Sequence, residues 1–394
     1  MSRKGGFIGG YDPLAQDPIV YSGKWNLSEQ MQAIAAGKWT GLPIVGSVYS
    51  WGYDSYGNLG RNTVANQPVS SPTQIGSETD FQDISVGYSH TLWKRGGAIY
   101  STGDNDNGQL GYGPSPGNVS SPTQIGSDTD WDVLGTCDDG SFCIKTNGAL
   151  YSWGRGELVG VNGQNDGINY SSPVQVGALT NWTKVNGRPY TVLGIKSDGT
   201  LWGWGNGVSG QLGLEPKPAG YVSSPTQIGT DTDWTEFSAG ANNSYFFKGT
   251  SLYACGYNLN GELGFGDKVA RSSPVQLAGE WTNINGWQSV WAVKSDGTLW
   301  AWGRNSEGET GLNDRVARSS PVQVGALTNW SFCMMGSASG FAIKTDGTLW
   351  SCGSQAYNGD NTNISRSSPV QIGLATDWLT VGAGASGMSG IRQV

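Results

Sequence analysis

The stretch "IKTDGTLWSCG", residues Ile343–Gly353, recurs along this chain with few changes. Close copies are "IKTNGALYSWG" from Ile144, "IKSDGTLWGWG" from Ile195 and "VKSDGTLWAWG" from Val293. Self-similarity at a regular spacing indicates a repeat architecture, in which each copy forms one structural unit. We therefore expect this chain to be built from copies of a single unit.

Three sequence markers recur seven times each after residue 45. Seven copies over residues 46–394 give a period of about 50 residues, which is typical of solenoids and propellers. The markers are a glycine that closes a strand (Gly52, Gly103, Gly154, Gly205, Gly256, Gly303, Gly353), a Ser-Ser-Pro element (Pro72, Pro122, Pro173, Pro225, Pro274, Pro321, Pro369) and an aromatic residue that opens a strand (Phe81, Trp131, Trp182, Trp234, Trp281, Trp330, Trp378).

Each copy is expected to form four short antiparallel strands, the arrangement of one propeller blade. Asn147-Gly148, Asp198-Gly199, Asp296-Gly297 and Asp346-Gly347 predict two-residue type I′ hairpins, which need positive φ at both central residues. The Ser-Ser-Pro element is expected to be the outermost strand, because proline lacks the N–H that an inner strand would need.

The two ends of the repeat region predict how the ring closes. When the last copy is aligned on Trp378, the chain stops halfway through a hairpin, and Gly46 begins the missing half. The terminal segment "SGIRQV" is therefore expected to pair with "GSVYSWG" at Gly46–Gly52. The sequence predicts an all-β fold, a seven-bladed propeller of four-stranded blades over residues 46–394, preceded by a separate arm, residues 1–45.

Two longer stretches resemble a known repeat family. "SHTLWKRGGAIYSTGDNDNGQLG" at Ser89–Gly111 and "GTLWGWGNGVSGQLG" at Gly199–Gly213 are similar to the repeat of the regulator of chromosome condensation family. The resemblance implies a seven-bladed propeller. It does not imply one function, because members include nucleotide exchange factors, a plant UV-B photoreceptor and secreted bacterial enzyme inhibitors.

The N-terminal arm carries a helix signal in "GKWNLSEQMQAIAAGKW", Gly23–Trp39. Asn26 and Glu29 fit a capping box, so a short helix is expected to follow. The segment resembles one that recurs in structural proteins of marine tailed phages, which implies an anchor role for residues 1–45. An N-terminal plug or strap over the propeller is an equally weighted alternative. The expected anchor side chains are Trp25, Leu27, Met31, Ile34 and Trp39.

Composition argues against several classes of function. A net charge of -8 disfavours nucleic acid as a partner, since phosphate binding needs a basic surface. No run of 18 apolar residues and no signal-peptide h-region are present, so no membrane role is expected. The five cysteines include no C-x-x-C pair and are expected to be buried free thiols. His90 is the single histidine, so we expect no catalytic triad, no metal, no cofactor and no enzymatic activity.

Two repeated features are interpreted as structural. The family's photoreceptor implies Gly-Trp-Arg-His-Thr in adjacent blades, whereas only Trp287 fits here, and Trp153, Trp204 and Trp302 are interpreted as packing between blades. A ring of cations precedes the hairpins; it is interpreted as a solvated rim, although attraction of an acidic partner stays open. Its expected members are Lys94, Lys145, Lys196, Lys248, Lys294, Lys344 and Arg392.

The loops between the first and second strands differ between copies and are expected to meet near the axis. They mix aromatic and polar side chains, as recognition surfaces do, although drift in unconstrained loops would also produce variety. The candidate ligand-binding residues are Tyr88, Asp138, Asp139, Arg188, Tyr190, Asn242, Asn243 and Trp287.

Two functions are weighed from these features. The first is a non-enzymatic structural protein of a tailed-phage virion, such as a tail fibre, spike or host-surface adhesin. Residues 1–45 would contact other virion proteins, and the propeller would recognise a host surface protein or glycan. The alternative is a cellular or secreted protein-binding propeller, inhibitor-like or scaffold-like. The expected location is accordingly the virion, or alternatively the cytoplasm or the exterior without a recognisable signal peptide.

Overall fold

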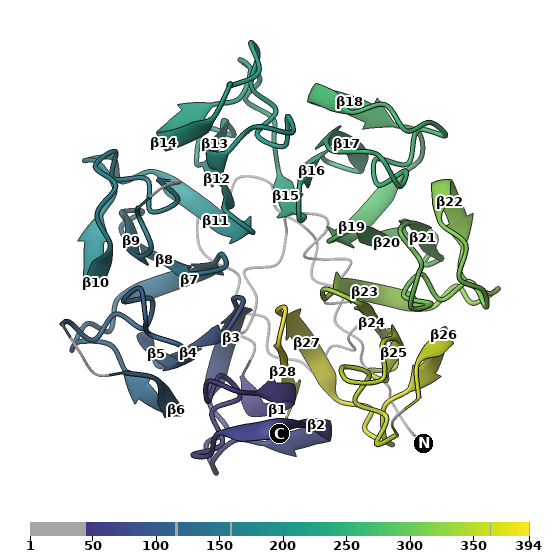
Figure 1. The fold of residues 1–394 in the computed structure, drawn as a ribbon, viewed down its shortest axis with the longest axis horizontal. Helices are drawn as coiled ribbons and strands as arrows, with labels where there is room; N and C mark the ends of the chain where they lie inside the picture. The colour runs from purple at the N-terminus through teal and green to yellow at the C-terminus, as the bar shows by residue number, and fades with distance from the viewer. Residues whose placement is uncertain (1–44, 115–116, 158–159, 363, 394) are drawn as a thin grey trace, which may run out of the picture.

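The computed structural model describes residues 45–114, 117–157, 160–362 and 364–393. Within these ranges all helical or extended structure is β, and seven four-stranded blades surround a central axis (Figure 1). The predicted fold class is confirmed. The helix and the anchor residues Trp25, Leu27, Met31, Ile34 and Trp39 lie outside the described residues, so the division at residue 45 stays a prediction.

The blades are numbered along the chain, and the strands of each are given from the axis outward. Blade I is β3 (Phe81–Val86), β4 (His90–Arg95), β5 (Ala98–Gly103) and β6 (Val119–Gln124). Blade II is β7 (Trp131–Thr136), β8 (Gly140–Lys145), β9 (Leu150–Gly154) and β10 (Tyr170–Gln175). Blade III is β11 (Trp182–Arg188), β12 (Thr191–Lys196), β13 (Leu201–Asn206) and β14 (Tyr221–Gln227).

The remaining blades continue the same order. Blade IV is β15 (Glu236–Ala239), β16 (Asn243–Lys248), β17 (Ser251–Gly256) and β18 (Arg271–Leu277). Blade V is β19 (Trp281–Gly286), β20 (Ser289–Lys294), β21 (Leu299–Gly303) and β22 (Arg318–Gln323). Blade VI is β23 (Trp330–Met335), β24 (Ser339–Lys344), β25 (Leu349–Gly353) and β26 (Arg366–Gln371). Blade VII is β27 (Trp378–Ala383), β28 (Gly387–Gln393), β1 (Gly46–Asp54) and β2 (Ala65–Gln74).

Blade VII contains both ends of the described chain, as the sequence predicts. Strand β28 pairs antiparallel with β1 from Gly46↔Gln393 to Gly52↔Gly387. A single further pair, Gly46↔Phe81, connects this blade to blade I, so the two form one eight-stranded sheet. Closing the ring in this way protects the strand edges that an open array would leave exposed.

One hydrogen bond recurs between every pair of adjacent blades. The residue before the strand-closing glycine on the third strand donates its side chain to a loop carbonyl of the preceding blade. The interpretation of Trp153, Trp204 and Trp302 as inter-blade packing is thereby confirmed. The seven bonds are Thr102 to Asn58 (3.5 Å), Trp153 to Gln109 (2.9 Å), Trp204 to Val161 (2.8 Å), Cys255 to Gln211 (3.7 Å), Trp302 to Glu262 (2.7 Å), Cys352 to Glu309 (3.5 Å) and Trp51 to Tyr357 (3.0 Å).

The predicted two-residue hairpins are wrong. In the loop after β12, the Lys196 N–H donates to Thr200 O and the Gly199 N–H donates to Lys196 O, so three residues form the turn. Only Gly199 has positive φ, at +74°. This geometry is a type I turn followed by a bulge, which needs one left-handed residue instead of two. Asp198 then keeps an ordinary backbone conformation, and its Oδ1 accepts the Thr200 N–H at 3.0 Å.

The ring of cations is placed correctly except for Lys94. In blade I the residue paired with Phe81 is Arg95, whose Cζ lies 6.0 Å from the Phe81 ring centroid. The hairpin at Gly96-Gly97 is one residue shorter than its counterpart after β8, which shifts the register. The other ring members also pack on aromatic rings; Lys196 Nζ, for example, lies 3.3 Å from the Trp202 centroid. These cations cover aromatic surface instead of projecting freely.

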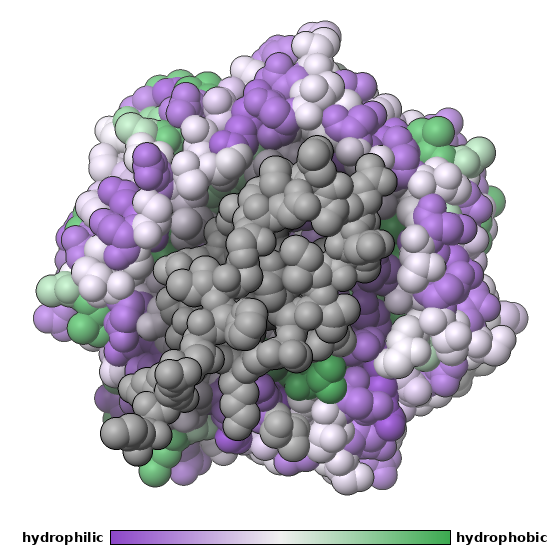
Figure 2. Space-filling view, turned by 180° about the vertical axis from the view of Figure 1, so that it is seen from behind, coloured by the Kyte–Doolittle hydropathy of each residue, from purple (hydrophilic) through white to green (hydrophobic). Residues whose placement is uncertain are grey.

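The outer surface agrees with two further predictions. The Ser-Ser-Pro elements form the outermost strand of each blade. On the face drawn in Figure 2, hydrophobic residues of the rim lie in small separate patches among hydrophilic ones. All five cysteines are buried and free, as expected. In the part of the chain that the structure describes, no helix is both long and apolar enough to cross a membrane.

The closure predicts that Gly46 tolerates no side chain. A Cβ at this position would lie 1.9 Å from the Arg392 carbonyl oxygen. Gly46→Ala is expected to lower the free energy of unfolding by about 2 kcal/mol or more, because the paired backbone must move. Gly117→Ala is the matched control, since a Cβ there meets nothing within 4 Å. Urea unfolding followed by tryptophan fluorescence measures both; equal stability of the two variants would contradict the closure.

The inter-blade bond predicts that replacing two tryptophans of one strand by phenylalanine lowers the free energy of unfolding by different amounts. Trp204→Phe leaves the buried Val161 carbonyl without its donor and is expected to lower the free energy of unfolding by about 1–3 kcal/mol. Trp202→Phe, whose Nε1 donates only to the Thr200 hydroxyl, is expected to cost less than about 1 kcal/mol. Thermal unfolding compares them, and an equal or larger loss in Trp202→Phe would contradict the inter-blade role.

Candidate binding site at the axial loops

The loops that follow the innermost strands gather on one face of the disc. All inner strands occupy the same place in equivalent blades, so the loops after them emerge together around the axis (Figure 1). Tyr88 lies 48% exposed in the loop of blade I. Its backbone N–H donates to Asp138 O at 3.3 Å, and its carbonyl accepts the Ser386 hydroxyl at 2.7 Å. The loops of blades VII, I and II are thus connected at the candidate site.

Asp139, Arg155 and Tyr190 form the next part of this surface. Arg155 Nη1 lies 3.1 Å from Asp139 Oδ2, within blade II. The Arg155 guanidinium carbon also lies 5.6 Å from the ring centroid of Tyr190, in blade III. One cation therefore joins a predicted carboxylate to a predicted aromatic residue of the neighbouring blade.

Arg188 and Trp287 meet although they come from blades III and V. The Arg188 guanidinium carbon lies 5.1 Å from the Trp287 ring centroid. Its Nη2 donates to Met334 Sδ, in blade VI, at 3.7 Å. Arg188 therefore spans the axis, and this contact brings together two candidates that are distant in the sequence.

Asn243 supports the site from beneath instead of forming its surface, whereas Asn242 is partly exposed. The Asn243 side chain is buried, and its Nδ2 donates to the Trp287 carbonyl at 3.3 Å. The Asn242 carbonyl accepts the Tyr257 N–H at 2.8 Å. Asn243 thus fixes the loop that carries Trp287, a role that the sequence analysis did not assign.

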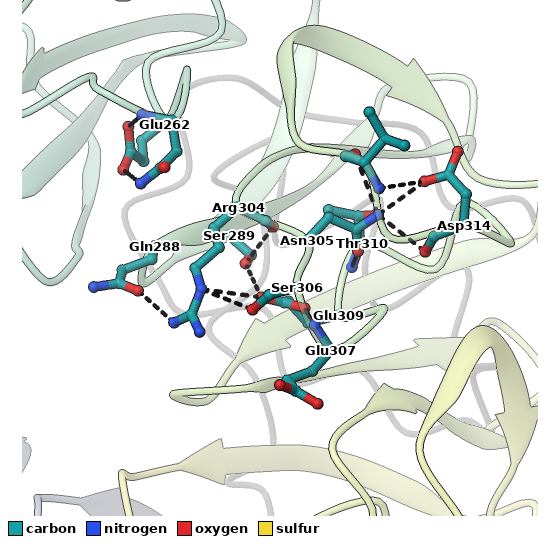
Figure 3. Close-up of polar contacts among 12 residues, drawn as sticks. Glu262, Gln288, Ser289, Arg304, Asn305, Ser306, Glu307, Glu309, Thr310 and Asp314 are labelled. Carbon is teal, nitrogen blue, oxygen red and sulfur yellow. Dashed lines mark hydrogen bonds and ion pairs between the residues drawn. The ribbon is translucent and has the colours of Figure 1, made fainter.

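Sequence reasoning missed the arginines that follow two strand-closing glycines. Arg155 follows Gly154, and Arg304 occupies the same position after Gly303. Figure 3 shows Arg304 between Gln288 and the buried Glu309: its Nη1 donates to Gln288 Oε1 at 2.6 Å, and its Nε lies 4.0 Å from Glu309 Oε1. The sequence does distinguish these two residues, because only two of the seven copies have an arginine directly after the strand-closing glycine.

The site contains one carboxyl with a strongly altered pKa. Burial, and then repulsion from Asp139, raises the pKa of Asp138 to about 7, although Arg188 and Arg155 act in the opposite direction. Asp138 is only 9% exposed. At neutral pH its charge is therefore incomplete.

His90 is buried, and the described residues form no metal site. His90 is buried, its Nε2 lies 2.9 Å from Ser141 Oγ, and burial lowers its pKa to about 4. Across the described ranges, no group of three or more His, Cys, Asp and Glu side chains is placed to hold a metal ion. The groups that the axial loops do present are hydrogen-bonding and aromatic side chains, which are common in recognition surfaces.

Asp138 predicts a pH-dependent change in stability. Its folded pKa of about 7 lies above the ordinary value of 3.8, so its proton favours folding below about pH 4, and this contribution is lost as the pH rises through 7. Asp138→Asn cannot ionise and is expected to be about 1–3 kcal/mol more stable than wild type at pH 8, with little difference at pH 4.

Urea unfolding at the two pH values measures this difference. Asp106→Asn removes the same charge from an exposed loop position, and its effect is expected to stay within about 0.5 kcal/mol at both. An Asp138→Asn protein no more stable than wild type at pH 8 would contradict the burial argument.

Comparison with known proteins agrees with this geometry. The family model described as "Regulator of chromosome condensation (RCC1) repeat" matches residues 45–93, 96–134, 198–247 and 296–342. The ultraviolet-B receptor UVR8 of Arabidopsis thaliana is 30% identical over 269 residues, which cover 64% of this chain and 59% of the receptor. The E3 ubiquitin-protein ligase HERC2 of Homo sapiens is 30% identical over 247 residues, 59% of this chain but 5% of the ligase. The chain thus spans less than two thirds of either relative.

Solved structures show the same fold at lower identity. Yeast Prp20, crystallised with Kap60, superposes with a TM-score of 0.78 at 21% identity, covering 98% of this chain and 97% of the yeast chain. A second structure of Prp20p from Saccharomyces cerevisiae, whose study addressed binding to Gsp1p and histones, gives 0.77 at 22% identity and covers 90% and 93%. Human WBSCR16 gives 0.77 at 17% identity, covering 88% and 99%. The four matched segments carry repeats of the regulator of chromosome condensation (RCC1) type. The superposition shows that the chain has the same propeller fold as these solved structures.

Proposed function

We propose that this protein is a non-enzymatic protein-binding propeller that recognises its partner through the axial loops. The observation that carries the proposal is the axial stack of Arg188, in blade III, on Trp287, in blade V. On the same face Arg155 packs on Tyr190, and Tyr88 is 48% exposed in a loop whose backbone is bonded to that of blade II. Aromatic residues and arginine are the side chains that most often dominate binding energy in protein interfaces.

The scaffold and the relatives support this proposal. A ring closed by inter-blade bonds holds variable loops in fixed positions, as recognition sites require. Among structures of the same fold, Prp20 was crystallised with Kap60 and studied for binding to Gsp1p and histones. From these proteins we take only that a protein of this fold binds other proteins.

A structural role in a tailed-phage virion stays a prediction that rests on residues 1–45 alone. That segment lies outside the described residues, and none of the relatives named above is a virion protein. The protein-binding alternative has support from both the axial surface and the fold. It also keeps the expected absence of enzymatic activity as part of the proposal.

Affinity capture with the full chain tests this function. Tyr88→Ala combined with Trp287→Ala is expected to reduce partner recovery at least tenfold, because it removes two aromatic contact surfaces from one face. Tyr221→Ala is the matched control, since Tyr221 is 51% exposed on an outer strand far from the axis.

Deleting residues 1–45 separates the two functions. The proposed function predicts that the truncated chain keeps its partner, whereas the virion role predicts that partners are lost with the arm. Partner recovery that is equal in the double variant and in Tyr221→Ala would overturn the axial-loop proposal.

A further inference from the structure

A cavity occupies part of the axial channel behind the loop face. It has a volume of about 240 Å³ and lies between the inner strands β11, β15, β19 and β23. Its lining includes Asn186, Arg188, Ser238, Asn283 and Met334. A water molecule occupies about 30 Å³ of liquid, so this space matches roughly eight waters or one small organic group. Asn186 is exposed and Arg188 partly exposed, so solvent reaches the cavity.

Two asparagines offer hydrogen-bond donors to this space. Asn186 Oδ1 accepts the backbone N–H of Thr136 at 3.2 Å, and Asn283 Oδ1 accepts the backbone N–H of Cys333 at 2.8 Å. A backbone N–H can only donate, so each amide oxygen must face it and each Nδ2 must point away. Within the described residues neither Nδ2 has a hydrogen-bond partner. Both amides therefore present N–H groups and no acceptor.

Arg188 adds a cation with an unused donor. Its Nη1 is buried and has no hydrogen-bond partner among the described residues, while Nη2 contacts only the weak acceptor Met334 Sδ. Burial lowers the pKa of Arg188 to about 10, which still leaves the guanidinium charged at neutral pH. Glu236, the one carboxylate among the described residues that line the cavity, is already paired with Lys184 Nζ. Asp138, outside the lining, attracts Arg188 electrostatically but makes no hydrogen bond to Nη1. A buried donor without an acceptor is costly, and a bound acceptor would remove that cost.

The copies of the repeat show that Arg188 is a departure from the pattern. At the equivalent position four copies have glycine, at Gly87, Gly240, Gly336 and Gly384, and one has Cys137. The two large residues at this position, Arg188 and Trp287, are the pair that stack on each other. Independent drift of surface loops gives no reason for the two exceptions to stack on each other. Of the two, Arg188 lines the cavity.

We propose that this axial cavity binds a carboxylate group, with Arg188 Nη1 and the amide N–H groups of Asn186 and Asn283 as its donors. The inference rests on the proposed function and names the chemistry of the partner. An acidic side chain or a C-terminal carboxylate of a bound protein enters the channel from the loop face, and a small free carboxylate meets the same donors. A guanidinium is well matched to a carboxylate, because its planar N–H groups fit the two oxygens.

Calorimetric titration of the full chain with succinate tests the cavity. Wild type is expected to bind succinate and not succinamide, the neutral compound of the same shape. Arg188→Gln is expected to weaken succinate binding at least tenfold, since it removes the cation and keeps a side chain of similar length. Arg315→Gln removes the same charge from an exposed loop and is expected to bind like wild type. Circular dichroism establishes that both variants are folded.

Two results would overturn the proposal. One is equal affinity of Arg188→Gln and Arg315→Gln for succinate; the other is binding of succinamide as tightly as succinate. Arg188→Lys tests the role of the guanidinium geometry. Lysine keeps the positive charge but lacks the planar pair of N–H donors, so its affinity for succinate is expected to be intermediate. Affinity of Arg188→Lys below that of Arg188→Gln would also contradict a carboxylate site.

Titrations with short peptides identify the source of the carboxylate. Three short glycine peptides are compared by the same titration: one with a free C-terminus, one amidated, and one amidated with an internal glutamate. Binding of the first or the third supports a protein source, whereas succinate binding without either supports a small free carboxylate. Partner capture that depends on Tyr88 and Trp287 but persists in Arg188→Gln would exclude a carboxylate of the partner as the occupant and leave the proposed function intact. If Arg188→Gln also binds succinate like Arg315→Gln, the carboxylate site itself is refuted.

Discussion

The hydrogen bond from each third strand to the loop of the preceding blade is the contact on which the ring depends. It occurs at all seven interfaces, including the one between the composite blade and blade I. A blade cannot bury its hydrophobic face alone, so stability comes from the interfaces with its neighbours. Where the donor is tryptophan, the same side chain fills the interface and satisfies a loop carbonyl. Packing and hydrogen bonding therefore fix the blade spacing together.

Because the third strands make the recurring bonds between blades, the axial loops are free to differ from one blade to the next. The strand cores repeat because each must fit the next, whereas the first-to-second strand loops contact one another only around the axis. Large residues can enter there without disturbing the blades, as Arg188 and Trp287 do where most copies have glycine. The channel consequently holds side chains whose donors are not used by the fold itself, and these groups define the surface available for recognition.

Much of the architecture could be predicted from the repeat alone. The blade number, the order of strands and the pairing of Gly46–Gly52 with the terminal strand all follow from internal alignment, because equivalent sequences must adopt equivalent structures. Alignment could not give the hairpin geometry at Asp198-Gly199, where a bulge replaces the second left-handed residue. It also misplaced the cation of blade I, because the Gly96-Gly97 turn is one residue shorter than its counterpart.

The seven blades, the closure and the set of variable loops follow from the repeat pattern, since periodicity and turn residues are local properties. Which of those loop residues meet depends on the arrangement of the blades in space. Arg188, Trp287 and Met334 lie far apart in the chain and touch because ring closure brings blades III, V and VI around a common axis. The same closure buries Asn243 behind Trp287, and it leaves Arg188 Nη1 buried without an acceptor. Contacts across the axis depend on the radius and rotation of the ring, which no repeat unit contains.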